Sequence, residues 1–475
     1  MDMRSECGKQ GAAPSRKKRC KRRARRPRHG ASNRQTQVAS NHITPSSARP
    51  EHGRFLPMKL PHLERRPELD ALRGLFLVWM TLTHLPTKFA TFVNQPIGFV
   101  SSAEGFVFVS ALLVGRLYLR EWLENAQNAR RKLWRRSLKI YGYHLIMLAL
   151  AFTVAASFAV HTRKTAILNL LNFYLAHPVV AIVGSVLLLY CPPLLDILPM
   201  YVTFLFFTPL VLAAAVRFGW RWIIVASGFV WLLAQFGLRD AVHNWTVHVT
   251  HLNIPLQETG AFNLFAWQAL WVVGLWVGAR TAMNEPILRR VPGWAAAFAC
   301  GLCVFFMGIR HGWLGPHMTQ QVLDAQLDKW KIGPLRVLNL ASFSLVLYWL
   351  RRYLLRIVAI EPFLTLGKAS LRVFCTHIFF VFAGLALLYG DVDYTDGVPQ
   401  LHGLTAIALL AVTFSVLMIV AVNEARKKRA ARLKRQQESG GAIPVSIERA
   451  GGRTHPIDAA GKQQVIGEPG ELRST

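Results

Sequence analysis

The sequence has few charged residues and lacks the motifs of the common soluble enzyme classes. Asp, Glu, Lys and Arg make up 17% of its 475 residues, well below the roughly 25% of soluble proteins. There is no P-loop, no zinc-ligand spacing, no serine nucleophile elbow and no dinucleotide-binding fingerprint. The six cysteines include Cys300 and Cys303 within an apolar run, where they are best explained as small apolar side chains. We therefore expect no disulfide framework, no bound metal and no resident cofactor.

Acidic residues are scarce, and the excess of cations is unevenly placed. The chain has 56 Lys and Arg against 25 Asp and Glu, a net charge of +31. The densest basic block, residues 16–28, would by itself suggest nucleic-acid binding. A basic cytoplasmic tail before a first membrane span explains it better, so we expect no nucleic-acid partner. No apolar signal region precedes residue 70, so we expect no removable signal peptide, and Met58 is an alternative start.

Long apolar runs fill the middle of the chain. Hydrophobic residues make up 52% of the sequence, and the mean hydropathy is +0.28. Because the runs are continuous and near twenty residues long, they predict an all-α, polytopic transmembrane helix bundle and not a β-barrel. The ten candidate spans are residues 70–92, 96–119, 138–160, 198–217, 220–238, 262–280, 293–311, 334–355, 366–389 and 402–423.

The distribution of Lys and Arg between these spans predicts the topology. With both termini in the cytoplasm, the basic segments 120–137, 281–292 and 351–365 all fall on the inside, as the positive-inside rule requires. Counting residues 179–195 as a further span would invert every later loop, so we expect that segment to lie on the outer face without crossing. The predicted organisation is a basic tail (1–65), a ten-span membrane domain (66–425) and a basic, then disordered, tail (426–475).

An arginine and a histidine share one face of the first candidate span. Arg73 and His84 are eleven residues apart, about three helical turns, so they lie within about 20° of each other, and Asp70 lies on nearly the same face. Ionisable groups in a span are costly and usually mark a site. We expect His84 to act as a general base on a sugar hydroxyl, unless it is simply hydrogen-bonded within the bundle. Arg73 could hold a phosphate or an acyl carboxylate, or could be a snorkelling arginine.

Glu104 is the third candidate for the catalytic site. It lies in the next apolar run, and a helical hairpin turning near residues 94–96 would bring it to the depth of His84. We expect its carboxylate to orient the His84 ring and fix its tautomer. Arg135 and Arg136, just before the third candidate span, could bind a phosphorylated donor such as coenzyme A, or could only determine topology.

Several polar residues in later segments are secondary candidates. His377 lies deep in the ninth candidate span and could be a second polar member of a cavity. Asp196, Asn263, Trp267 and Gln268 are expected near the outer face, where amide and indole groups suit a carbohydrate. Helix capping and an aromatic interface belt are the alternatives for these four residues.

These segments resemble a known family. Arg66–Gly74 followed by His84 resembles the first-span signature of the acyltransferase-three superfamily, and within it the OpgC family. The resemblance extends over about residues 65–425 and is supported by four segments. They are Ala103–Ser110, Asp196–Tyr201, Phe262–Gln268 and Leu366–His377. The chain departs from the family in its long basic N-terminal tail and in Ala111, where we expect Gly.

The resemblance implies an activity and a location. It implies a multi-pass protein of the bacterial inner membrane that moves an acyl group, possibly succinyl, from cytoplasmic acyl-CoA to a hydroxyl of a periplasmic glycan, as in OpgC-like glucan modification. It also carries Arg73, His84 and Glu104 over as the site, with Arg135 and Arg136 as donor-binding residues. The alternative is a secondary transporter or proton-coupled permease that uses the same intramembrane residues.

Overall fold

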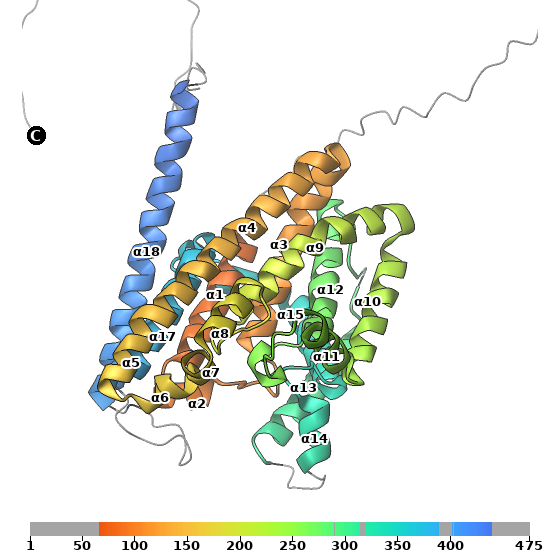
Figure 1. Ribbon diagram of the computed structural model, residues 1–475. Coiled ribbons are helices and arrows are strands. Elements are labelled where there is room, and N and C mark those ends of the chain that lie inside the picture. The colour runs from red at the N-terminus through yellow and green to blue at the C-terminus, as the bar shows by residue number, and fades with distance from the viewer. Residues whose placement is uncertain (1–65, 289, 314–319, 389–400, 402, 439–475) are drawn as a thin grey trace, which may run out of the picture. The chain divides into compact units, whose positions relative to one another are not determined.

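The computed structural model describes residues 66–288, 290–313, 320–388, 401 and 403–438, and these residues are almost entirely helical. The expected tail over residues 1–65 lies outside them. Figure 1 shows the arrangement of the helices. The described residues include ten long helices, each of at least 16 residues. They are α1 (Pro67–His84), α3 (Ser102–Glu124), α4 (Ala126–Leu150), α9 (Ile197–Phe218), α10 (Trp220–Gln235), α12 (Leu264–Ala282), α13 (Gly293–Arg310), α15 (Pro334–Val358), α17 (Ser370–Leu388) and α18 (Gly403–Glu438).

Short helices connect the long ones. They are α2 (Lys88–Val93), η1 (Ala151–Ala155), α5 (Ala156–Thr162), α6 (Thr165–Leu170), α7 (Asn172–Ala176), α8 (Pro178–Val186), α11 (Leu238–Thr250), η2 (Leu256–Thr259), α14 (Gln320–Leu327) and α16 (Phe363–Lys368). α8 has nine residues, about 13 Å of helix, which is too short to cross a hydrocarbon core of about 30 Å. The segment 179–195 therefore does not form a full helical span, as the charge pattern predicted.

Six helices of the described chain are long and apolar enough to cross a membrane, and a seventh span results if α10 and α11, bent by 78°, are counted together. This establishes a multi-pass helical protein. α1 and α15 contain several charged residues, and these charges reduce their hydropathy. The ten-span count and the orientation of the termini stay predictions.

Several helix boundaries differ from those predicted, and three of them bear on the residues discussed below. The first candidate span ends at His84, because Pro86 follows and cannot continue the helix. α4 begins at Ala126, twelve residues before the predicted start, so that Arg135 and Arg136 lie within a helix and not in a loop. α18 continues to Glu438, a length of about 54 Å, and its basic C-terminal part extends beyond the other helices (Figure 1).

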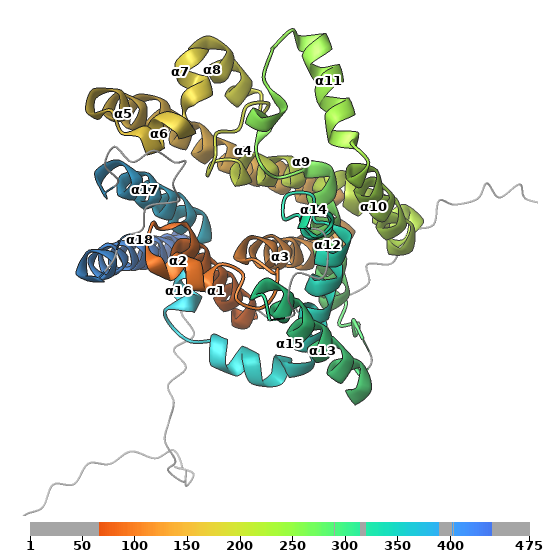
Figure 2. The same ribbon diagram turned by 90° about the horizontal axis from the view of Figure 1, so that it is seen from below.

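Small residues allow the central helices to approach closely. α3 and α12 form the most extensive helix pair, and they lie side by side near the middle of the bundle in Figure 2. A Cβ atom on Gly278 would lie 2.1 Å from the Leu112 carbonyl oxygen. Gly274 and Gly278 form the small-xxx-small pattern of closely packed membrane helices. In the same way Gly74 and Gly367 let α1 cross α16, and this crossing brings Arg73 to the pocket described below.

Candidate functional site

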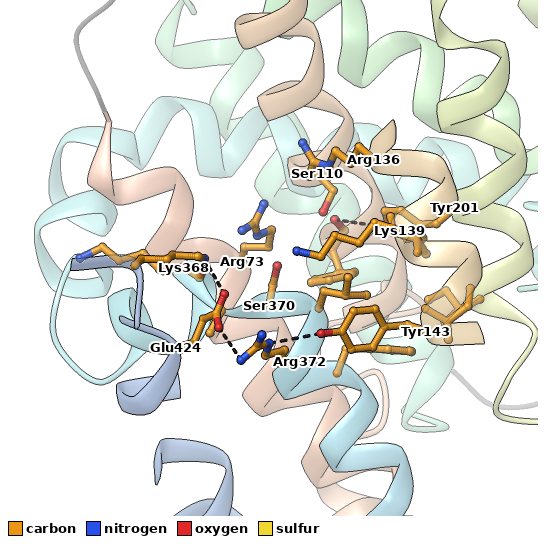
Figure 3. Close-up of a pocket in the computed structure, with 18 residues that line it drawn as sticks. Arg73, Ser110, Arg136, Lys139, Tyr143, Tyr201, Lys368, Ser370, Arg372 and Glu424 are labelled. Atoms are coloured by element: carbon orange, nitrogen blue, oxygen red, sulfur yellow. Dashed lines mark hydrogen bonds and ion pairs between the residues drawn. The ribbon is translucent and has the colours of Figure 1, made fainter. Parts of the chain in front are cut away.

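A cavity of about 320 Å³ lies among α1, α3, α4, α9, α16, α17 and α18. We call it the cationic pocket, because six cations and one carboxylate line it. These residues are Arg73, Arg136, Lys139, Lys368, Arg372, Lys428 and Glu424. Figure 3 shows Arg73, Lys139 and Arg372 reaching the same space from α1, α4 and α17. A pocket with this excess of positive charge is suited to a ligand with several negative charges.

Arg73 is the most deeply buried cation of the pocket. Its side chain donates to the Gly367 carbonyl oxygen and lies 3.7 Å from an Asp70 carboxylate oxygen. Its Nε is buried and has no hydrogen-bond partner among the described residues. A guanidinium held on one side by the protein and unpartnered on the other is prepared to bind an anion. Asp70 thus positions Arg73 and is absent from the pocket lining.

Glu424 neutralises part of the pocket. Its carboxylate oxygens lie 2.6 Å from Arg372 Nη1 and 3.3 Å from Lys428 Nζ, and Arg372 Nε donates to the Tyr143 hydroxyl. Arg136 and Lys139 form no ion pair within the described chain. Their charges are therefore available to a ligand.

Of the two predicted donor-binding arginines, only Arg136 lines the cationic pocket. Arg135 precedes it on α4 and is exposed. Consecutive helical residues point about 100° apart, so a pair in sequence does not form a pair in space. The sequence prediction missed Lys139, one turn after Arg136 and on the same helix face, although helical spacing would have suggested it.

Two histidines meet beside the cationic pocket. His84, the last residue of α1, is half-buried, and His377 of α17 is fully buried. His84 Nδ1 and His377 Nε2 are 3.3 Å apart, and the rings stack with an interplanar angle of 14°. His377 follows Phe374 by one helical turn, and Phe374 lines the cationic pocket. The histidine pair is thus adjacent to the pocket.

The hydrogen bonds of this pair fix the tautomer of both rings. His377 Nδ1 lies 2.7 Å from the Phe374 carbonyl oxygen. A carbonyl oxygen can only accept, so His377 Nδ1 carries the hydrogen and its Nε2 carries the lone pair. His84 Nδ1 must then donate to His377 Nε2. In the neutral pair, His84 therefore presents an unprotonated Nε2, which is the form that a general base needs.

The prediction that Glu104 orients His84 is wrong, because the partner of Glu104 is Arg336 and the partner of His84 is His377. Both Glu104 oxygens are occupied: one accepts from Arg336 Nε of α15, and the other accepts from the Ser101 backbone N–H at 2.7 Å. Glu104 and Arg336 are 0% and 1% exposed. A fully buried guanidinium is the stronger partner for a carboxylate, whereas His377 is available to His84.

Lys329 interacts electrostatically with His84 and with the Glu104–Arg336 ion pair. It lies in the loop before α15, within electrostatic range of His84, Glu104 and Arg336. Burial lowers the pKa of the Lys329 ammonium, and Arg336 acts in the same direction, whereas Glu104 opposes both. Arg336 and Lys329 were both missed at the sequence level. An arginine within the apolar run 334–350 carries the same signal that identified Arg73.

The remaining candidates have structural partners. Asn263 accepts hydrogen bonds from the N–H groups of Phe265 and Ala266 and caps α12. Trp267 is buried and donates to the Trp330 carbonyl oxygen, and Gln268 is paired with Ser227. For these three residues, capping and packing account for the observed contacts.

Asp196 also has a backbone partner. It accepts from the Ala261 N–H at 3.0 Å and makes no side-chain cap to α9. It thereby holds the segment before α9 against the loop before α12.

Most of the chain, including every residue of this site, matches a known protein family. The model of the family described as OpgC protein matches residues 65–429. The chain belongs to the OpgC protein family. The matched OpgC region contains both the cationic pocket and the histidine pair, and membership implies a membrane acyltransferase. No curated protein and no solved structure matches the chain.

Proposed function

We propose that this OpgC-family protein transfers an acyl group from cytoplasmic acyl-CoA to a hydroxyl of a periplasmic glycan. The observation that carries the proposal is the His84–His377 pair with its free Nε2, placed one helical turn from a pocket of six cations. A base and an anion site within reach of one extended donor are what acyl transfer from a phosphorylated thioester to an alcohol requires. The acyl group proposed is succinyl, and the acceptor proposed is a glucan.

In this proposal the cationic pocket holds the phosphates of coenzyme A. Arg136 and Lys139 attract the phosphates, and Arg73 provides the planar fork that a phosphate or a terminal acyl carboxylate can accept. Arg73 and His84 are separated by eleven residues, about 16 Å along α1. The extended pantetheine arm then leads the thioester past Phe106 and Phe374 toward the histidines.

Acyl transfer at the histidine pair needs no reactant besides the thioester and the acceptor hydroxyl. The acceptor hydroxyl oxygen forms the ester bond with the thioester carbonyl carbon, and the carbon–sulfur bond breaks. The hydroxyl proton passes to His84 Nε2 and then to the departing thiolate. His377 keeps His84 in the tautomer that a general base needs.

We propose that the ten long helices are the ten spans, with both termini cytoplasmic. Reporter fusions after residues 164 and 250 are expected to give periplasmic signals, and fusions after 285 and 360 cytoplasmic ones, because the Lys- and Arg-rich helix ends then all lie inside. A cytoplasmic signal at 250 would contradict this topology.

The matched pair Arg136 and Arg135 tests the donor site. Arg136→Gln is expected to raise the KM for acyl-CoA about 10-fold or more, since a charge-assisted hydrogen bond contributes roughly 1.5–3 kcal/mol. Arg135→Gln, which removes the neighbouring exposed charge, is expected to leave KM unchanged. The measurement is acyl transfer to glucan by purified protein in vesicles, followed by mass spectrometry of the glucan. Equal KM values for the two variants would remove Arg136 from the donor site. Proton uptake by the vesicles without acyl-CoA would instead favour a transporter.

A further inference from the structure

A second cavity, of about 690 Å³, lies between α15 and the group formed by α1, α3, α10 and α12. We call it the lateral groove. Its lining is almost wholly apolar, with Phe108, Leu270 and Leu345 among the residues that form its walls. α15 packs chiefly against α13, α1 and α14, whereas α3 and α12 pack against each other. One long flank of α15 therefore faces the groove and not another helix.

The groove has the length of a membrane leaflet or more. On α15 its lining extends from Val337 to Leu354, a rise of about 26 Å, compared with a hydrocarbon core of about 30 Å. Water is poorly stabilised between apolar walls because it needs polar partners. Hydrocarbon chains are the occupant that such a space accepts within a bilayer.

The polar groups at one end of the groove indicate a phosphate. Arg351 lines the groove and is exposed, with its guanidinium 4.2 Å from the centre of the Tyr348 ring. Tyr348 in turn donates to the Leu288 carbonyl oxygen and closes that end. A guanidinium stacked on an aromatic ring and open to solvent is well suited to a phosphate diester. An apolar groove ending at such an arginine matches the two parts of a phospholipid.

We propose that the lateral groove binds a phospholipid of the inner leaflet, with its acyl chains along α15 and its phosphate at Arg351. Only the assignment to the inner leaflet rests on the topology given under the proposed function. The bound lipid packs against the flank of α15 that faces the groove. It thereby supports α15, the helix on which Arg336 reaches Glu104. The lipid thus helps to hold the buried ion pair beside the histidine pair.

Native mass spectrometry of the full-length protein, purified in mild detergent and supplemented with phosphatidylglycerol, tests this site. Arg351→Gln is expected to lower the retained phospholipid about ten-fold. Arg352→Gln is the matched control, because Arg352 is the adjacent exposed arginine and lies outside the groove lining. Ser344→Trp should fill the groove and abolish retention, whereas Leu338→Trp, on an exposed part of α15 outside the groove, should not.

Equal retention by the Arg351→Gln and Arg352→Gln variants would overturn the proposal, and so would a bound molecule without phosphate. If Ser344→Trp fails to fold, the arginine pair still decides the question. The readout is bound lipid and not acyl transfer, so a negative result leaves the proposed function in place. Conversely, a protein that binds the lipid but transfers no acyl group would contradict the function alone.

Discussion

His84→Ala is expected to lower the rate of acyl transfer by about 10²–10⁴-fold, the usual contribution of a positioned general base. An alcohol is a poor nucleophile at neutral pH, and His84 Nε2 is the free lone pair of the histidine pair. The KM for acyl-CoA should change little, because the cationic pocket is formed by other residues. The measurement is the initial rate of glucan acylation, normalised to the amount of membrane-inserted protein.

His377 provides the accompanying test of the tautomer. His377→Gln places an amide oxygen where it can accept from His84 Nδ1, so it should retain far more activity than His377→Phe, which cannot. Both variants fill the site, so their comparison separates positioning from packing. Wild-type rates in His84→Ala, or equal rates in the two His377 variants, would remove the pair from the mechanism.

Arg336→Met is expected to lower the free energy of unfolding by about 3–5 kcal/mol, since it leaves the buried Glu104 carboxylate without its cation. The double variant Glu104→Gln with Arg336→Met should recover most of this loss. The amide can still accept the Ser101 N–H, and no charge remains buried. Denaturant unfolding of purified protein in detergent measures both quantities.

A matched control is available at the C-terminal end of α12. Arg280 and Glu285 form an ion pair at 3.2 Å with side chains 35% and 52% exposed. Arg280→Met should cost no more than about 1 kcal/mol, because solvent already screens the pair. If Arg336→Met were as mild as Arg280→Met, or if the double variant were less stable than the single one, the ion pair would have no structural role.

The sequence predicted the helical class and most helix boundaries. A continuous apolar run of about twenty residues crosses a membrane as a helix, because only a helix satisfies all its backbone hydrogen bonds within the run. α9, α12 and α13 begin and end within two residues of their predicted limits. The start of α4 was missed because its first turns are basic and polar, and hydropathy does not detect a helix that extends beyond the bilayer. The helical form of Arg135 and Arg136 depends on propensity, which the span criterion ignores.

Candidate site residues could be selected from the sequence, but their pairing could not. Arg73, His84 and Glu104 were identified because charges within apolar runs are rare. Which of them touch could not be derived, because contacts across the bundle depend on helix rotation and on partners far along the chain. His377 is 293 residues from His84, and Arg336 is 232 residues from Glu104. Two charged or polar residues at similar depth are neighbours only if no better partner lies between them, and Arg336 was the better partner for Glu104.

The end of α1 at His84 has a consequence for the charge that the base acquires. The aligned peptide dipoles of an α-helix give its C-terminus about half a negative charge. His84 occupies the last turn of α1, where Pro86 stops the helix. When the ring takes up the hydroxyl proton, the resulting imidazolium lies at the negative pole of an eighteen-residue helix. The proline that interrupts the first span thus supplies, through the backbone alone, part of the stabilisation that a carboxylate provides in other histidine sites.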